Sequence, residues 1–168
     1  MSSLKWVLIG LLVIIVIAVA VVFVRGFMGS PKRVVTIEKF YGGIEEGGDL
    51  GGLELEDSKS DRYGRRIHTY FIDRLEDGER YKEYPRITAY GDGKIQVIGP
   101  EEEGSWEFNG SVKGKMYFKS HEQTNQEVTS PLTYKDWVIK WWEGDNYKVI
   151  VISDTSRDAH ETFKISLE

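Results

Sequence analysis

The sequence predicts a mainly β protein, in which one N-terminal transmembrane α-helix precedes a domain built as an antiparallel β-sandwich or β-barrel. Three observations lead to this fold class. An unbroken apolar run extends from Trp6 to Val24, between Lys5 and Arg25. From about residue 67 onward, turn signals recur roughly every 8 to 12 residues, as in all-β domains. Short segments rich in β-branched and aromatic residues lie between these turns.

The apolar run is long enough to cross a bilayer as a helix. Its nineteen residues span about 28 Å at a rise of about 1.5 Å per residue, and backbone groups in lipid must pair within the segment. Leu, Ile, Phe and Val each favour insertion by about 0.3–0.6 kcal/mol. We therefore predict a membrane anchor over residues 1–25, surrounded by the lipid bilayer. The residues expected to contact lipid or its interface are Trp6, Leu11, Ile15, Val19 and Phe23.

A cleaved signal peptide is the main alternative for this run. Ala18-Val19-Ala20 has the small-x-small form that signal peptidase recognises. Cleavage there would leave Val21 to Val24 as an apolar new N-terminus, which favours the uncleaved anchor. A type IV pilin leader is rejected because no Glu lies inside the run. A buried core helix of this length would need a polar face.

Two signals disagree about the side of the membrane on which the domain lies. Positive charge favours the cytoplasmic side, and Arg25, Lys32 and Arg33 outnumber Lys5 and the α-amine near the run. Uncleaved anchors with short N-terminal tails usually place the large domain outside. We expect the extracytoplasmic side, with the cytoplasmic side as the alternative.

The soluble part of the chain is acidic. Residues 26–168 contain all 27 acidic residues and 20 of the 22 basic ones, a net charge of −7. This balance argues against nucleic acid as a partner, since such a surface needs a basic stripe. The chain has no cysteine, so it forms neither a disulfide nor a zinc–thiolate site. No cofactor and no metal are expected.

A linker and a glycine-rich loop are predicted at the start of the soluble part. The linker covers residues 26–33, where Gly, Ser and Pro stop the helix. The β-rich domain covers residues 34–168, and Val34–Tyr41 is its first predicted strand. Residues 42–60 are predicted to be a mobile Gly/acid-rich loop. It lacks the G-x-G-x-x-G spacing and the Lys-Ser/Thr pair of phosphate-binding loops.

Hairpins are predicted along the rest of the domain. The turns are expected at Glu76-Asp77-Gly78, Gly91-Asp92-Gly93, Asn109-Gly110 and the loop from Asp154 to His160. The strands beside them are expected at Ile67–Ile72, Ile87–Tyr90, Lys94–Ile98, Trp106–Phe108, Val112–Lys119, Tyr147–Ser153 and Thr162–Leu167. In the last strand, alternation places Phe163, Ile165 and Leu167 on one face.

The segment from Ser130 to Gly144 fits both a helix and a strand. As a helix it has Ser130 as a cap, Pro131 at the first position and apolar residues at helical spacing. As a strand it places Trp141 and Trp142 on opposite faces. Its three Trp and its β-branched residues favour the strand, and the helix stays open.

Catalytic and metal-binding motifs are weak throughout the sequence. His121 and His160 are each followed by Glu but lack the second His of a zinc hydrolase motif. Asp154, Asp158, His160 and Glu161 are expected to form a solvated polar loop rather than a cation site. Asn109-Gly110-Ser111 is a glycosylation sequon, which the predicted turn explains by itself. We expect no enzyme.

Three segments resemble part of a lipocalin barrel: ITAYGDGKIQVI, GKMYF and YKVIVISD, within Ile87 to Asp154. Lipocalins hold small apolar ligands in an eight-stranded cup. The resemblance covers under half of the chain and implies a meander of neighbouring strands.

The aromatic residues give the best functional lead. Rows of Trp and Tyr on a sheet bind sugars, lipids or proteins, or else form a core. The expected function is a non-catalytic, membrane-anchored structural or interaction subunit of a membrane-associated assembly, such as an envelope complex, coat or virion, with protein partners. The alternative is a tethered β-domain that binds a lipid or glycan through an aromatic face. The candidate interface or ligand aromatics are Trp106, Trp137, Trp141, Trp142 and Tyr147.

Overall fold

The computed structural model describes residues 2–27, 33–62, 64–71 and 84–168, and within the N-terminal helix it describes the side chains of residues 7 and 9–20. The chain divides into two units, Met1–Lys32 and Arg33–Glu168. The first unit contains a helix and the second contains strands in two antiparallel sheets, so the prediction of a mainly β protein with one N-terminal helix is confirmed.

Helix α1 covers Ser2–Phe27. The described side chains of the predicted anchor, Leu11, Ile15 and Val19, are exposed within this unit. Those of Trp6 and Phe23 lie outside the described residues. Across the part of the chain that is described, no helix has both the length and the hydropathy needed to cross a membrane.

The linker predicted at residues 26–33 overlaps the end of this helix. Gly26 and Phe27 are helical, and residues 28–32 lie outside the described part of the chain, as does the predicted turn Glu76-Asp77-Gly78.

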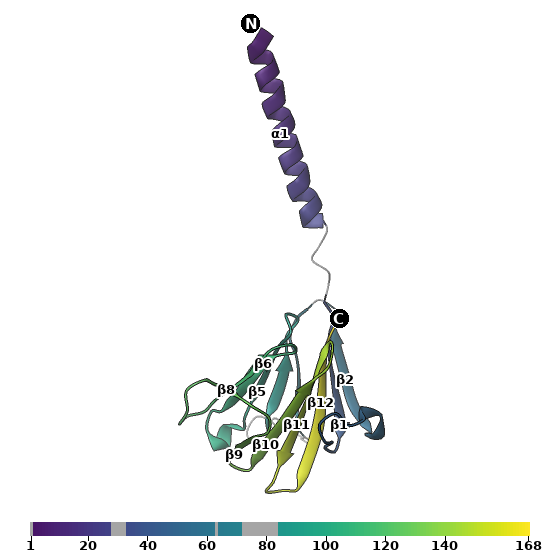
Figure 1. Ribbon diagram of the computed structural model, residues 1–168, viewed down its shortest axis with the longest axis vertical. Coiled ribbons are helices and arrows are strands. Elements are labelled where there is room, and N and C mark those ends of the chain that lie inside the picture. Colours follow the sequence, from purple (N-terminus) through teal and green to yellow (C-terminus); the bar gives the residue numbers. More distant parts are fainter. Residues whose placement is uncertain (1, 28–32, 63, 72–83) are drawn as a thin grey trace. The chain divides into compact units, whose positions relative to one another are not determined.

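The described residues of the β-rich unit form two antiparallel sheets (Figure 1), each of six strands. In sheet A the order is β2 (Leu55–Asp61), β1 (Val35–Tyr41), β12 (Ala159–Leu167), β11 (Tyr147–Asp154), β10 (Trp137–Glu143) and β9 (Leu132–Tyr134). In sheet B it is β3 (Ile67–Tyr70), β4 (Arg86–Ala89), β5 (Lys94–Ile98), β6 (Glu107–Ser111), β7 (Met116–Lys119) and β8 (Gln126–Val128). Short 3-10 helices, η1 (Leu50–Gly52) and η2 (Glu101–Glu103), lie in two connections.

The two sheets face each other across one hydrophobic core, so the fold is a sandwich. Alternation along each strand supplies the core, as in β11, where Ile150 and Ile152 point inward, and in β12, where Phe163 and Ile165 do. Fully burying each such side chain contributes about 1.5–3 kcal/mol. The meander implied by the lipocalin resemblance is present in sheet B, but the eight-stranded cup is wrong, because the strands form two six-stranded sheets with a filled interior.

The segment from Ser130 to Gly144 is β and not helical. It forms a tight hairpin in which β9 pairs with β10, and Trp137 lies opposite Tyr134. The turn between them places Lys135 at φ 51°. The strand interpretation is therefore confirmed. The short strand β9 was not predicted separately, because its residues belonged to the segment that fitted both a helix and a strand.

The predicted turn at Asn109-Gly110 is wrong, because both residues lie inside β6. Gly110 pairs with Met116, and a Cβ on Gly110 would lie 2.4 Å from the Met116 sulfur and 2.4 Å from the Lys115 carbonyl oxygen. The glycine is therefore required for close packing of two strands. The chain turns after Ser111 instead, which lets Val112 enter the core.

The glycine-rich segment packs against the outer face of sheet A. The Thr162 hydroxyl donates a hydrogen bond of 2.8 Å to the Gly42 carbonyl, and a Cβ on Gly43 would lie 3.1 Å from His160. The predicted loop over residues 42–60 is wrong for its last third, since residues 55–60 belong to β2. This strand is polar because it is an edge strand that pairs with β1.

Candidate functional site

Two of the five predicted interface aromatics form the core instead. Trp106 and Trp137 are each 2 % exposed, and their ring centres are 6.3 Å apart. Phe71 meets Trp137 edge-on at 5.3 Å, and Phe118 lies 6.2 Å from Trp106. For these two Trp residues the core interpretation holds, and their rings are not available to a partner.

The other three aromatics lie nearer the surface but on different faces. Trp141 points inward and packs on Phe108 at 4.9 Å. Trp142 points to the outer face of sheet A, as strand pleating requires. On the same outer face, the Lys164 ammonium lies 5.3 Å from the Tyr147 ring. The five aromatics therefore do not form one binding row.

Trp141 and Trp142 line a cleft of about 550 Å³ between the sheet edges. Lys148 reaches into its base, where its ammonium donates a hydrogen bond to the Gly114 carbonyl and lies 4.0 Å from the Glu143 carboxylate. Burial lowers the pKa of Lys148, and the charge of Glu143 offsets this only in part. The lysine joins sheet A to the β6–β7 turn of sheet B, so it acts as a structural tie.

A second hollow, which we call the sheet B groove, lies on the outer face of sheet B. It is an open groove of about 700 Å³. The register of β4 to β7 places its side chains in two transverse rows. Gln96 lies opposite Asn109, and Asn109 lies opposite Tyr117. In the next row Lys94 lies opposite Ser111, and the Tyr90 backbone N–H donates to the Lys94 carbonyl, which places Tyr90 beside Lys94. Two tyrosines thus border a polar floor.

Hydrogen bonds fix the floor of the groove. The Tyr90 hydroxyl donates to Gln96 Oε1 at 3.0 Å, and Asn109 Nδ2 donates to Glu107 Oε1 at 2.9 Å. Within the described part of the chain, the Tyr117 hydroxyl has no hydrogen-bond partner. The hydrogen-bonded side chains of the floor are already held in place, so they lose little conformational entropy when a ligand binds.

Glu107 is the central charged group of the floor. Burial alone raises the pKa of its carboxyl, but hydrogen bonds from Lys119, Gln96 and Asn109 outweigh this and the resulting pKa is lower than usual. The Lys119 ammonium lies 2.9 Å from the carboxylate. Glu107 therefore stays ionised at neutral pH, which does not suit a general acid.

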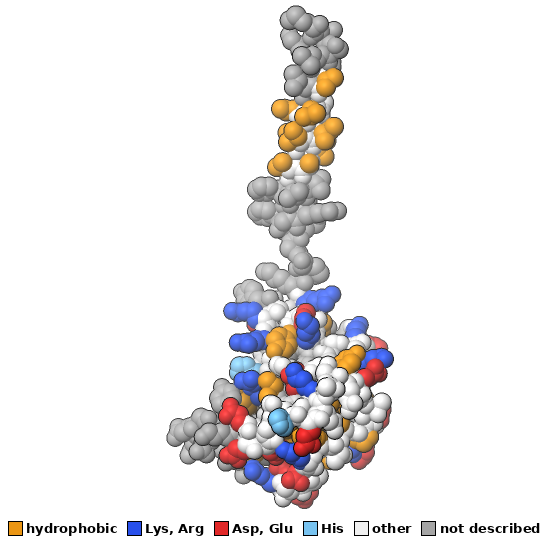
Figure 2. All heavy atoms as spheres, turned by 90° about the vertical axis from the view of Figure 1, so that its left-hand side faces the viewer, with side chains coloured by type: hydrophobic (Ala, Val, Ile, Leu, Met, Phe, Trp, Pro, Cys, Tyr) orange, Lys and Arg blue, Asp and Glu red, His pale blue; other side chains and the backbone are white. Residues whose placement is uncertain are grey.

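Charges around the groove are paired with one another. Lys94 lies 3.2 Å from Asp92, and Lys115 lies 2.8 Å from Glu127. The Glu127 hydrogen bond raises the pKa of Lys115. On the β-rich unit, the face visible in Figure 2 likewise shows both acidic and basic side chains, with apolar side chains only in scattered places. The groove therefore offers no net attraction to either sign of charge.

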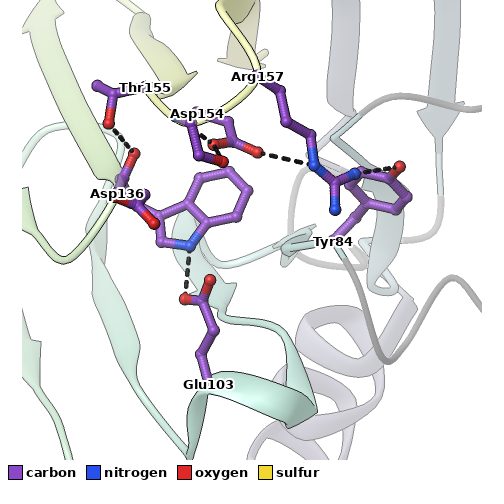
Figure 3. A network of polar contacts seen from close by, with 8 residues as sticks. Tyr84, Glu103, Asp136, Asp154, Thr155 and Arg157 are labelled. Atoms are coloured by element: carbon purple, nitrogen blue, oxygen red, sulfur yellow. Dashed lines mark hydrogen bonds and ion pairs between the residues drawn. The ribbon is translucent and has the colours of Figure 1, made fainter.

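A network of polar contacts closes one end of the sandwich (Figure 3). The buried Trp137 indole N–H donates to Glu103 Oε2 at 2.6 Å, which ties β10 to η2. Arg157 Nη1 donates to the Tyr84 hydroxyl at 2.6 Å, and Arg157 pairs with the buried Asp154 carboxylate at 3.5 Å. The Trp137–Glu103 and Arg157–Tyr84 contacts join segments far apart in sequence, and the local Arg157–Asp154 pair holds the arginine between them, so the network is structural.

The residues of the predicted polar loop do not converge. Asp154 accepts hydrogen bonds from Ser156, His160 lies 3.4 Å from Asp158, and Glu161 lies in the interior, 3.4 Å from the buried Lys39. Over the described ranges, no group of three or more His, Asp or Glu side chains is placed to hold a metal ion.

Comparison of the chain with known proteins finds no matching family, no similar curated protein and no matching solved structure. The candidate site therefore depends on geometry alone. Its main residues, Tyr90, Gln96, Asn109 and Tyr117, were not predicted from the sequence, because outward residues on β5, β6 and β7 and the residue after β4 become neighbours only through the strand register. The sequence signal that could have indicated this surface is the alternation of apolar and polar residues in the strands on either side of the turn at Gly91-Asp92-Gly93, which places Tyr90 and Gln96 on the outer face.

Proposed function

We propose that this protein is a non-catalytic interaction subunit held at a membrane, and that the sheet B groove is its binding surface. The observation that carries the proposal is the groove itself, in which Tyr90 and Tyr117 border a floor of polar side chains fixed by mutual hydrogen bonds. Binding sites combine apolar surface with a few well-placed polar groups in this way.

The membrane part of the proposal is supported by the sequence. The apolar run from Trp6 to Val24 contains no charged residue, and the soluble part carries net negative charge, which keeps it away from anionic lipid. We place the β-rich unit on the extracytoplasmic side. Carbonate extraction tests the anchor, and release of the protein by carbonate contradicts it. Protease treatment of intact cells tests the orientation, and a domain that is protected from the protease contradicts it.

The non-catalytic part is supported by the state of the titratable groups in the groove. Glu107 accepts hydrogen bonds that keep it ionised, and the groove lysines pair with carboxylates. General acid–base catalysis needs a group with a pKa near the working pH, so these groups suit recognition better than proton transfer.

Co-purification tests the interaction role. The tagged full-length protein is extracted from its native membrane in mild detergent, and bound partners are identified. Ser111→Arg places a bulky charge in the groove, while Ser166→Arg places the same charge on the outer face of sheet A and is the matched control. We expect Ser111→Arg alone to lose the partner. A wild-type protein that elutes alone and monomeric contradicts the proposal.

A further inference from the structure

We propose that the ligand of the sheet B groove is a neutral oligosaccharide segment of about three sugar rings. The inference rests on the proposed function and assigns a ligand class to the same surface. It follows from three properties of the groove: its aromatic borders, its hydrogen-bonding floor and its balanced charge.

The aromatic borders set the length of the ligand. Tyr90 follows β4 and Tyr117 lies on β7, three strand spacings away. Neighbouring strands lie about 4.8 Å apart, so the backbones of the two tyrosines are about 14 Å apart across the sheet, comparable to the length of a trisaccharide. Tyr90 lies in the row of Lys94 and Ser111, and Tyr117 lies in the neighbouring row of Gln96 and Asn109, so the ligand would cross the groove obliquely. The apolar faces of sugar rings pack on aromatic rings, which present wide contact area at low entropy cost.

The floor between the tyrosines matches hydroxyl groups. Asn109 and Gln96 carry amides that both donate and accept, and Glu107 and Ser111 add further acceptors. These groups bond to one another only in part, and a lipid chain would cover their remaining donors and acceptors without pairing them, at a cost in free energy. A glycan offers donors and acceptors at every ring, so it satisfies this floor and a lipid chain does not.

The charge balance selects a neutral ligand. Both lysines that line the groove have a carboxylate within 3.2 Å, in the pairs Lys94–Asp92 and Lys115–Glu127, and Lys119 beside the groove pairs with Glu107 of the floor at 2.9 Å. An anionic ligand would have to compete with these carboxylates for the same cations. A neutral ligand leaves all three pairs in place.

The test measures binding of five neutral trisaccharides (maltotriose, cellotriose, xylotriose, mannotriose and chitotriose) to the full-length protein by calorimetry. The protein is kept in a detergent without a sugar head group. We expect at least one of them to bind with a Kd of about 1 mM or tighter. Tyr117→Ala and Tyr90→Ala should each weaken it at least about tenfold, while Tyr147→Ala, on the outer face of sheet A, changes it less than about twofold.

Every other outcome contradicts the assignment. It fails if no trisaccharide binds, if both groove variants bind as the wild type does, or if only the anionic trigalacturonic acid binds. Two groove variants are used so that one misfolded protein, detected by its unfolding temperature, leaves the other informative. If Ser111→Arg abolishes a protein partner but no sugar binds, the ligand class is wrong and the interaction role stands.

Discussion

Replacement of Lys39 by Met should be among the most destabilising single substitutions in this protein. Lys39 is 0 % exposed although it carries a charge, and it lies on the inner side of β1 in line with Val35 and Ile37. Its ammonium is 2.9 Å from the Glu56 carboxylate and 3.4 Å from the Glu161 carboxylate. One buried cation thus holds two carboxylates.

The magnitude follows from these distances. At an effective dielectric constant of about 20, the two attractions amount to about 6 and 5 kcal/mol, before the cost of removing three charges from water. Methionine keeps the length and volume of lysine but leaves two buried carboxylates without their cation. Removing one partner of a buried ion pair costs about 3–5 kcal/mol, and we expect Lys39→Met to lower the free energy of unfolding by this amount.

Urea unfolding followed by Trp fluorescence measures the effect, and a double variant tests its origin. Lys39→Met/Glu56→Met removes one unpaired carboxylate, so it should recover at least about 1 kcal/mol relative to the single variant. Glu161 keeps a further interaction in the protein. The reasoning is refuted if Lys39→Met costs less than about 1 kcal/mol, or if the double variant is no more stable than the single one.

Three further substitutions test buried contacts within the β-rich unit. Glu103→Ala removes the acceptor of the buried Trp137 indole and should cost about 1.5–3 kcal/mol in chemical unfolding. Gly99→Ala places a Cβ 2.0 Å from the Trp106 ring and should cost at least about 1–3 kcal/mol. The pKa of Lys148 in the folded protein lies below its usual 10.5, so the unfolded chain binds this proton more tightly. The free energy of unfolding of the wild type should therefore increase as the pH rises from the folded pKa toward 10.5. Lys148→Met should remove this increase.

Each of these has a control. Glu103→Gln keeps an acceptor oxygen and should lose less than Glu103→Ala; equal losses would mean that the carboxylate does not act through the indole. Gly52→Ala has open space around its Cβ and should change stability by less than about 1 kcal/mol. A wild-type profile of stability against pH that is parallel to that of Lys148→Met would contradict the burial argument.

Most of the fold could be predicted from local patterns. The strands predicted at Val34–Tyr41, Tyr147–Ser153 and Thr162–Leu167 are rich in β-branched and aromatic residues, and the structure contains them as β1, β11 and β12. The errors come from positions where tertiary contacts decide. Gly110 indicated a turn locally, but it is needed where β6 meets Met116. Strand β2 lacks apolar alternation and is stabilised by pairing with β1.

The candidate site was harder to predict than the fold. Large aromatics attracted attention in the sequence, yet Trp106 and Trp137 are buried because a sandwich needs large side chains in its core. The groove uses residues of ordinary appearance, such as Gln96 and Asn109, which become neighbours across β5 and β6. Their proximity depends on the register of distant hairpins, which no local pattern contains.

Site-specific cross-linking tests the binding surface most directly. A photoreactive amino acid is placed at Tyr117, in the sheet B groove, or at Tyr147, on the outer face of sheet A, in the full-length protein in its native membrane. Illumination should give a product of higher mass for position 117 and none for position 147. A product at position 147 alone, or at neither position, would contradict the assignment of the sheet B groove as the binding surface.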